Sequence, residues 1–247
     1  MTLFPVHFNH SSVLYSNTIP YLHLREGKEA FHFIGANGYP PAAYASFLSQ
    51  MDVRWSIYSM LLRPLWPQCP DGQNLKDWRP FLDDFLAYLS LFSIENSVFC
   101  GHSIGGTIAL MAALTERVQP KAVICIDPAI FSRWMVVLYR VVYFFGLQRW
   151  VHPYIKKSLS RINRFKQISE VYVSYKKKSI FKLFSNKDLE LYIRSLFKPT
   201  SSGVELTYCR EWEAKIYETG TFLDQSHIWS RLEHCSCPVL VLAAEKS

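Results

Sequence analysis

A serine between two glycines, where an apolar run gives way to small residues, constrains this chain more than any other feature. Residues 97–100 are typical of a buried strand, and residues 107–114 form a small-residue run that favours a helix. Between them stands Gly101-His102-Ser103-Ile104-Gly105. A strand and a helix joined so sharply pack closely at the turn, which requires glycine on both sides. The pattern predicts that Ser103 is held in a strained backbone conformation with its hydroxyl exposed.

A serine in this position has the surroundings of a nucleophile. The backbone N–H of Ile104 would lie at a helix N-terminus, where it can stabilise a developing oxyanion. A serine hydroxyl is a weak nucleophile at neutral pH, so a base must take its proton and an acid must orient that base. The alternative is a glycine-rich helix entry with a structural serine.

Strands and helices alternate over the first half of the chain. Strands are expected at 13–16, 19–24, 30–35, 53–61, 97–100 and 122–126, and helices at 44–51, 78–92 and 107–114. The alternation favours a parallel sheet with right-handed crossovers, and the apolar run 123–126 suits a strand buried on both faces. Asp83 and Asp84 are expected on the surface of the second helix, one of them bracing a loop at Arg63.

With these elements in place, the chain resembles an α/β-hydrolase from about residue 13 to its end. Residues 101–106 (Gly-His-Ser-Ile-Gly-Gly) are similar to that family's nucleophile elbow, and residues 35–40 (Gly-Ala-Asn-Gly-Tyr-Pro) to its oxyanion loop. The resemblance implies a mostly parallel sheet with helices on both faces and an inserted helical cap. It also implies an oxyanion hole from backbone N–H groups of Asn37, Gly38 and Ile104. Asn37 stands where related chains often have a histidine.

The expected organisation has three parts: a core with the elbow at 1–130, a helical basic cap at 131–236 and a return strand of the core at 237–247. Residues 131–236 hold eighteen Lys and Arg against nine Asp and Glu, whereas the rest of the chain has nine against eleven. Aromatic side chains are interleaved with these cations. Such a surface suits a membrane interface or an acyl-chain entrance. A solvated basic face with aromatics packed on the core is the alternative, and nucleic acid is not an expected partner, because no recognised module accompanies the charge.

The remaining members of a catalytic triad are harder to place. In this family the order along the chain is serine, acid, histidine. The sequence ends shortly after the strand expected at 238–242, so the last strand and helix of the usual fold, with the acid and histidine, are expected to be missing. Three interpretations stay open: an incomplete copy of an active hydrolase, a natural short form or inactive relative, and a chain in which another residue is the base.

Several residues of this chain are candidates for the missing roles. Asp127 ends the strand at 122–126 and is a candidate acid by resemblance to some lipases, with a turn-forming aspartate before proline as the alternative. Among the histidines, His227 and His234 are the best placed to approach the serine as a base, with surface or cap packing as the alternative. His102 is expected to point away from it, and His152 to lie in the cap. His32 is expected to pack within a strand.

The sequence therefore predicts a serine hydrolase that acts on small carboxylic esters with an apolar acyl group through an acyl-enzyme on Ser103. The alternative is a catalytically inactive or incomplete α/β-hydrolase domain that binds an apolar ligand or an anionic membrane surface. No cofactor or metal is expected, because the six cysteines lack zinc spacing. Reduced cysteines, and no evident signal peptide or spanning helix, lead us to expect a cytoplasmic protein with peripheral membrane contact through the cap.

Overall fold

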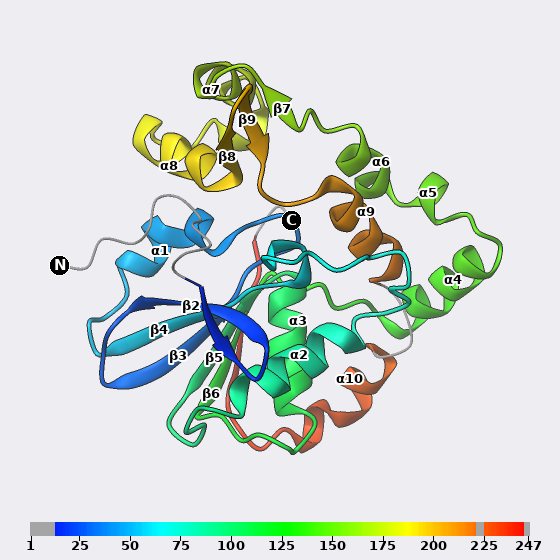
Figure 1. Cartoon of the computed structure of the whole chain (residues 1–247). Coiled ribbons are helices and arrows are strands. Elements are labelled where there is room, and N and C mark those ends of the chain that lie inside the picture. Colours follow the sequence, from blue (N-terminus) through cyan, green and yellow to red (C-terminus); the bar gives the residue numbers. More distant parts are fainter. Residues whose placement is uncertain (1–12, 221–224, 245–247) are drawn as a thin grey trace.

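The computed structural model describes residues 13–220 and 225–244, without the side chains of residues 225–227. Its described residues form a seven-stranded sheet in the order β1-β2-β4-β3-β5-β6-β10 (Figure 1). The strands are β1 (Leu14–Ser16), β2 (Ile19–Arg25), β3 (Glu29–Ile34), β4 (Trp55–Met60), β5 (Val98–His102), β6 (Ala122–Ile126) and β10 (Val239–Leu242). The pairings from β4 to β10 are parallel, and the two that add β2 and β1 at one edge are antiparallel. The predicted mostly parallel sheet is confirmed.

Helices cover both faces of this sheet, as predicted. They are α1 (Ala45–Ser49), α2 (Arg79–Leu89), α3 (Ile104–Ala113) and α10 (Gln225–Arg231), with 3-10 turns η2 (Pro41–Tyr44), η3 (Arg63–Leu65) and η5 (Leu232–His234). Successive residues of a strand point to opposite faces. In β3, the ring of His32 contacts Tyr88 of α2, and the next ring, Phe33, contacts Phe47 of α1. Helices α1 and α2 therefore lie on opposite sides of β3.

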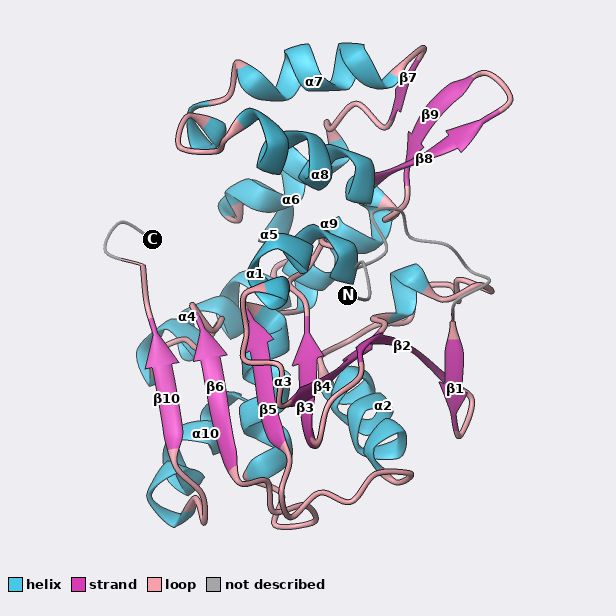
Figure 2. Ribbon diagram, turned by 90° about the vertical axis from the view of Figure 1, so that its left-hand side faces the viewer, coloured by secondary structure: helices cyan, strands magenta, loops and turns pink. Residues whose placement is uncertain are grey.

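An inserted segment, residues 133–219, lies beyond the carboxyl ends of β3, β5 and β6 (Figure 2). Its helices are α4 (Arg133–Phe144), α5 (Gln148–Val151), α6 (Pro153–Leu159), α7 (Ile168–Lys176), η4 (Ser179–Phe181), α8 (Asn186–Leu196) and α9 (Arg210–Thr219). It has a hydrophobic core of its own, in which Val171 of α7 packs with Leu189 and Ile193 of α8. The part of the segment from α7 to residue 206 therefore packs around its own apolar centre, whereas Trp212 and Ile216 of α9 belong to the hydrophobic core of the sheet.

The inserted segment also contains a small antiparallel sheet that the sequence analysis did not predict. Its order is β7 (Arg164–Phe165), β9 (Gly203–Leu206) and β8 (Phe197–Thr200). Gly203 follows the hairpin turn with φ +143°, and a Cβ there would lie 2.1 Å from the carbonyl oxygen of Phe165. This close approach needs glycine. Strands of two to four residues carry too little alternation to be read from sequence.

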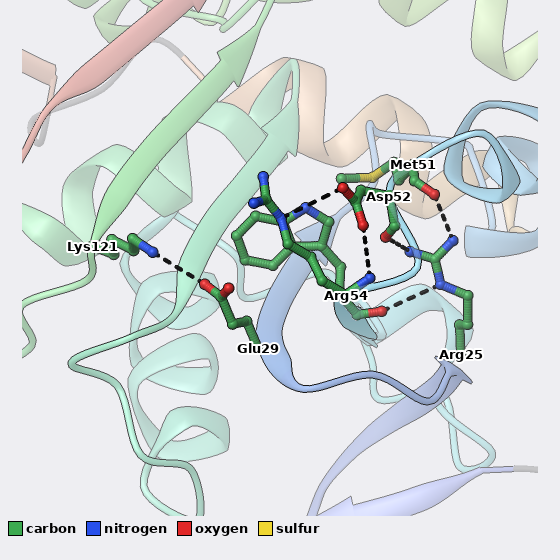
Figure 3. Close-up of polar contacts among 7 residues, drawn as sticks. Arg25, Glu29, Met51, Asp52, Arg54 and Lys121 are labelled. Atoms are coloured by element: carbon green, nitrogen blue, oxygen red, sulfur yellow. Dashed lines mark hydrogen bonds and ion pairs between the residues drawn. The ribbon is translucent and has the colours of Figure 1, made fainter.

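Polar contacts fix the amino ends of the parallel strands (Figure 3). Lys121, just before β6, lies 3.1 Å from the carboxylate of Glu29, the first residue of β3. The guanidinium of Arg25, at the end of β2, donates to backbone carbonyls at 2.9, 2.5 and 3.2 Å, those of Met51, Asp52 and Trp55. Ligands of open α/β sheets bind at the opposite, carboxyl ends of the strands. These contacts therefore stabilise the end of the sheet away from the elbow.

The loop after β4 is braced from α2, as predicted. Arg63 donates Nε and Nη2 to the two carboxylate oxygens of Asp84 at 2.7 and 2.9 Å. Asp84 is buried rather than on the helix surface, which corrects that part of the expectation. A carboxylate is buried at low cost only when it is paired in this bidentate way.

His32 is packed within β3, as predicted, and is almost completely buried. Its Nδ1 lies 2.7 Å from the hydroxyl of Tyr88, and its Nε2 has no hydrogen-bond partner among the described residues. Burial lowers the pKa of His32 from 6.5 to about 3. The folded chain therefore holds a neutral imidazole that the unfolded chain would protonate in mild acid.

We expect His32 to make the fold acid-sensitive. Stability contributed by its depressed pKa is fully present above pH 6.5 and is lost as pH falls from 6.5 towards 3. The free energy of unfolding should fall by up to about 1.4 kcal/mol per pH unit, because the chain takes up one proton when it unfolds. Urea unfolding between pH 7 and pH 4 measures it, and His32→Phe combined with Tyr88→Phe, which leaves neither partner unpaired, should reduce the slope. Equal slopes in the two proteins would contradict the assignment.

Candidate functional site

Ser103 lies at the turn between β5 and α3 with φ 54° and ψ −120°, a conformation that costs energy in a residue with a side chain. Its backbone is held on both sides. The Ser103 N–H donates to Ile126 O at 2.9 Å, and the Ser103 carbonyl accepts from the N–H groups of Thr107 at 3.1 Å and Ala129 at 3.3 Å. The strained conformation predicted from the motif is present and is fixed by the end of β6.

The glycines of the motif have the steric role predicted for them. A Cβ on Gly101 would lie 2.2 Å from the carbonyl carbon of Gly105, and a Cβ on Gly105 would lie 2.2 Å from Ile34 O. Both neighbours are backbone atoms and cannot rotate away. Helix α3 therefore approaches β5 and β3 at a distance that only glycine allows.

The predicted oxyanion loop is a tight turn beside the elbow. The Tyr39 N–H donates to Ala36 O at 3.1 Å, and Gly38, with φ +84°, occupies the position of a type II turn that requires positive φ. Ile104 is the first residue of α3, so its N–H has no acceptor within the helix. Asn37 and Ile104 line the same cavity as Ser103.

The side chain of Asn37 ties this loop to the inserted segment. Its Nδ2 donates to Glu213 O at 2.9 Å, and its Oδ1 accepts from the Tyr208 hydroxyl at 3.0 Å. All three residues are buried. A Cβ on Gly38 would lie 2.9 Å from the carboxyl carbon of Glu213, so the turn also fits tightly under α9. Asparagine supplies both the donor and the acceptor that this contact needs.

A cavity of about 590 Å³ opens above Ser103, between the sheet and the inserted segment. The core contributes Asn37, His102, Ser103, Ile104 and Asp127 to its wall, among others, and the inserted segment contributes His152, Tyr154, Lys157, Arg161, Glu213 and Tyr217. Four of the residues predicted for the site therefore share one cavity: Asn37, Ser103, Ile104 and Asp127. Gly38 lies in the adjoining turn and not in the wall.

His102 is a cavity residue whose Nδ1 already has a partner. Tyr44 accepts from the Ala36 N–H at 2.9 Å, so its own proton is available to His102 Nδ1, also at 2.9 Å. Where Tyr44 donates this proton, the ring proton of His102 is on Nε2. Burial lowers the pKa of His102, and the carboxylate of Asp127 opposes that shift. Burial thus favours the neutral form of His102, and its Nδ1 is engaged by Tyr44.

His152 reaches the cavity from the junction of α5 and α6, a position that sequence reasoning did not single out. Its ring centroid lies 5.4 Å from that of Tyr217 and 5.7 Å from that of Tyr154. Its buried Nδ1 makes no hydrogen bond to another residue in the described part of the chain. Burial lowers the pKa of His152. It is thus an imidazole at the cavity with a nitrogen able to accept a proton.

His234, one of the two candidate histidines, does not line this cavity. His234 belongs to η5, which precedes β10, and β10 runs parallel to β6. Residues before a parallel strand lie at its amino end, so His234 is at the opposite end of the sheet, where it is two-thirds exposed. His234 is therefore excluded as the base, and the alternative of a surface position holds for it. The side chain of His227 lies outside the described residues.

Asp127, the candidate acid, follows β6 with φ 43°, and its N–H donates to Leu242 O at 2.6 Å. It lines the cavity and acts on His102 as described above. A second carboxylate, Glu213, accepts from Arg161 Nη2 at 2.9 Å. Burial raises the pKa of Glu213, while Arg161 and Ser158 oppose the shift. Residues 13–220 and 225–244 contain no cluster of three or more His, Cys, Asp or Glu that could hold a metal.

We expect Gly105→Ala to disrupt the turn. The added methyl would overlap Ile34 O, and the structure can relieve this only by moving α3 from the sheet, at a cost of about 3 kcal/mol or more. Gly146→Ala is the control, because Gly146 has φ +67° but open space around it, so only about 1 kcal/mol of backbone strain is expected. Thermal or urea unfolding of both variants measures the difference, and similar losses would rule out the steric role.

The chain was compared with known families, curated proteins and solved structures. No known family model matches the chain, and no curated protein matches it. Among solved structures, E-2-(acetamidomethylene)succinate hydrolase is 12% identical with a TM-score of 0.62, covering 92% of this chain and 87% of its own. The thioesterase domain from the curacin biosynthetic pathway is 12% identical, with a TM-score of 0.63 and coverages of 94% and 82%. The peroxisomal α/β-hydrolase Lpx1 from Saccharomyces cerevisiae is 15% identical, with a TM-score of 0.57 and coverages of 95% and 70%. Sheet order, elbow and these similarities together show that the chain has the α/β-hydrolase fold.

Proposed function

We propose that the chain is a serine hydrolase that cleaves carboxylic esters with an apolar acyl group through an acyl-enzyme on Ser103. The observation that carries this proposal is Ser103 itself, strained at a glycine-tight turn and in the wall of a cavity of about 590 Å³. The hydrolase and the thioesterase that share the fold support acyl-transfer chemistry. We also propose that the inserted segment acts as the cap of this cavity.

The reaction would proceed in two displacements. Ser103 Oγ attacks the ester carbonyl while a base takes its proton, and the tetrahedral oxyanion accepts hydrogen bonds from the backbone N–H groups of Ile104, Asn37 and Gly38. The proton passes to the departing alcohol, which leaves an acyl-enzyme that water hydrolyses by the same route. Apolar and aromatic side chains such as Phe131, Ile180 and Ile216 line the cavity and favour an apolar acyl group.

His152 is the base that we propose among the described residues. It lines the cavity with a buried Nδ1 that makes no hydrogen bond to another described residue, whereas the Nδ1 of His102 is engaged by Tyr44. Asp127 remains the candidate acid from the core. Its carboxylate acts on His102, whose pKa it raises against the effect of burial.

Labelling by a fluorophosphonate tests the nucleophile directly. Such a probe phosphonylates a serine only where a base and an oxyanion site activate it. We expect one equivalent on the wild-type chain, read by intact mass, and none on Ser103→Ala. Ser158→Ala, another serine of the cavity wall, should retain the label. Undiminished labelling of Ser103→Ala, or none on the folded wild type, would rule the proposal out.

The base is tested by His152→Gln and by pH. A general base contributes about a hundredfold or more, so we expect the labelling rate to fall at least that far. The neutral imidazole accepts the proton, and burial lowers the pKa of His152, so the wild-type rate should persist below pH 6.5 before it declines. His102→Gln should have the smaller effect. A midpoint above pH 6.5, or an unchanged rate in His152→Gln, would exclude His152.

A further inference from the structure

The first helices of the inserted segment leave a large apolar face uncovered. Within α4 only Val136 is buried. Eight large apolar side chains of residues 133–151 are half to almost fully exposed. Two are Leu138 and Val151, and the other six are Trp134, Val137, Val141, Phe144, Phe145 and Trp150. Of these six, the four within α4 follow helical spacing and therefore share one side of the helix. Phe144 is 82% exposed and Trp150 88%, which is unusual for such large rings.

The charges around this face have a single sign. Between Asp127 and Glu170 the sequence has eight Lys and Arg and no Asp or Glu. Arg133 and Arg140 belong to α4 itself and form no ion pair within the described part of the chain. A solvated basic face would not expose tryptophan and phenylalanine between its cations, and a partner protein would have to supply a matching acidic, apolar surface. An anionic lipid surface offers both properties at once.

We propose that α4 and α5 dock on the surface of an anionic membrane. The docking surface consists of the six apolar residues named above, together with Arg133 and Arg140. The aromatic and aliphatic side chains enter the interface, and the two guanidinium groups contact lipid phosphates and carboxylates. No helix among the described residues is long and apolar enough to cross a membrane. The helices would therefore lie along the surface.

The docking surface adjoins the cavity above Ser103. Phe131 precedes α4 and lines that cavity, and His152 and Tyr154 line it from the chain that follows α5. Docking would bring this wall of the cavity close to the lipid. The proposal does not depend on hydrolysis, because binding to lipid can be measured in Ser103→Ala.

Co-sedimentation with lipid vesicles tests the docking surface. The probes are vesicles of phosphatidylcholine alone and of phosphatidylcholine with about one-third phosphatidylserine. We expect binding to the anionic vesicles that weakens with added salt, and much weaker binding to the neutral ones. Arg133→Gln with Arg140→Gln should lower the affinity about twenty-five-fold, at about fivefold for each charge. Phe144→Ser with Trp150→Ser should lower it at least about tenfold.

Matched controls separate docking from general stickiness and misfolding. Leu183→Ser removes a 97% exposed apolar side chain outside the docking surface and should leave binding unchanged. All variants replace exposed residues, so circular dichroism and unfolding should match the wild type. Equal binding to neutral and anionic vesicles, or unchanged binding of the two double variants, would overturn the proposal. So would a dimer in size-exclusion chromatography that Phe144→Ser with Trp150→Ser dissociates, since a second copy would then cover this face.

Discussion

The contact between α3 and the centre of the sheet is the constraint on which the rest of the site depends. At Gly105 the helix backbone lies against Ile34 O, at a distance that leaves no space for a side chain. A helix that starts so close to β5 leaves the connecting residue little choice of conformation, and Ser103 takes a positive φ. Hydrogen bonds from Ser103 to the end of β6 hold that conformation. Strain at the serine is thus maintained by a core that is buried along the whole of α3.

A second constraint joins the sheet to the segment above it. The Asn37 amide uses its donor on Glu213 O and its acceptor on the Tyr208 hydroxyl, and all of these groups are buried. A buried amide with both functions satisfied fixes orientation more strictly than apolar packing, because any other arrangement leaves a polar group unpaired. Glu213 is in turn paired with Arg161 in the cavity wall. The roof of the cavity is therefore positioned by these polar groups together with Trp212 and Ile216, which belong to the hydrophobic core of the sheet.

The sequence predicts an element well when the residues that specify it are close together along the chain. The strands, α2 and the elbow were predictable, because period, buried runs and glycine spacing are all contained within short windows. Strands as short as β7 leave no such signal, and neither does the burial of Asp84, which depends on Arg63 twenty-one residues away. His152 reaches the cavity only through the path of α5 and α6, which no local pattern specifies. His234 could not be placed, because its distance from Ser103 depends on the direction of β10.

The exposed aromatic face of α4 and α5 differs from the rest of the inserted segment. The inserted segment buries other aromatic rings without difficulty, since Tyr175 and Phe197 lie in its own core. Failure to fold is therefore no explanation for the exposure of Phe144 and Trp150. Exposing large rings costs free energy in water, about 25 cal/mol for each Å² of apolar area, and interleaved arginines do not remove that cost. This cost is removed where the rings leave water and the arginines contact anions at the same time. An anionic lipid interface satisfies both conditions, and α4 and α5 would meet it beside the cavity.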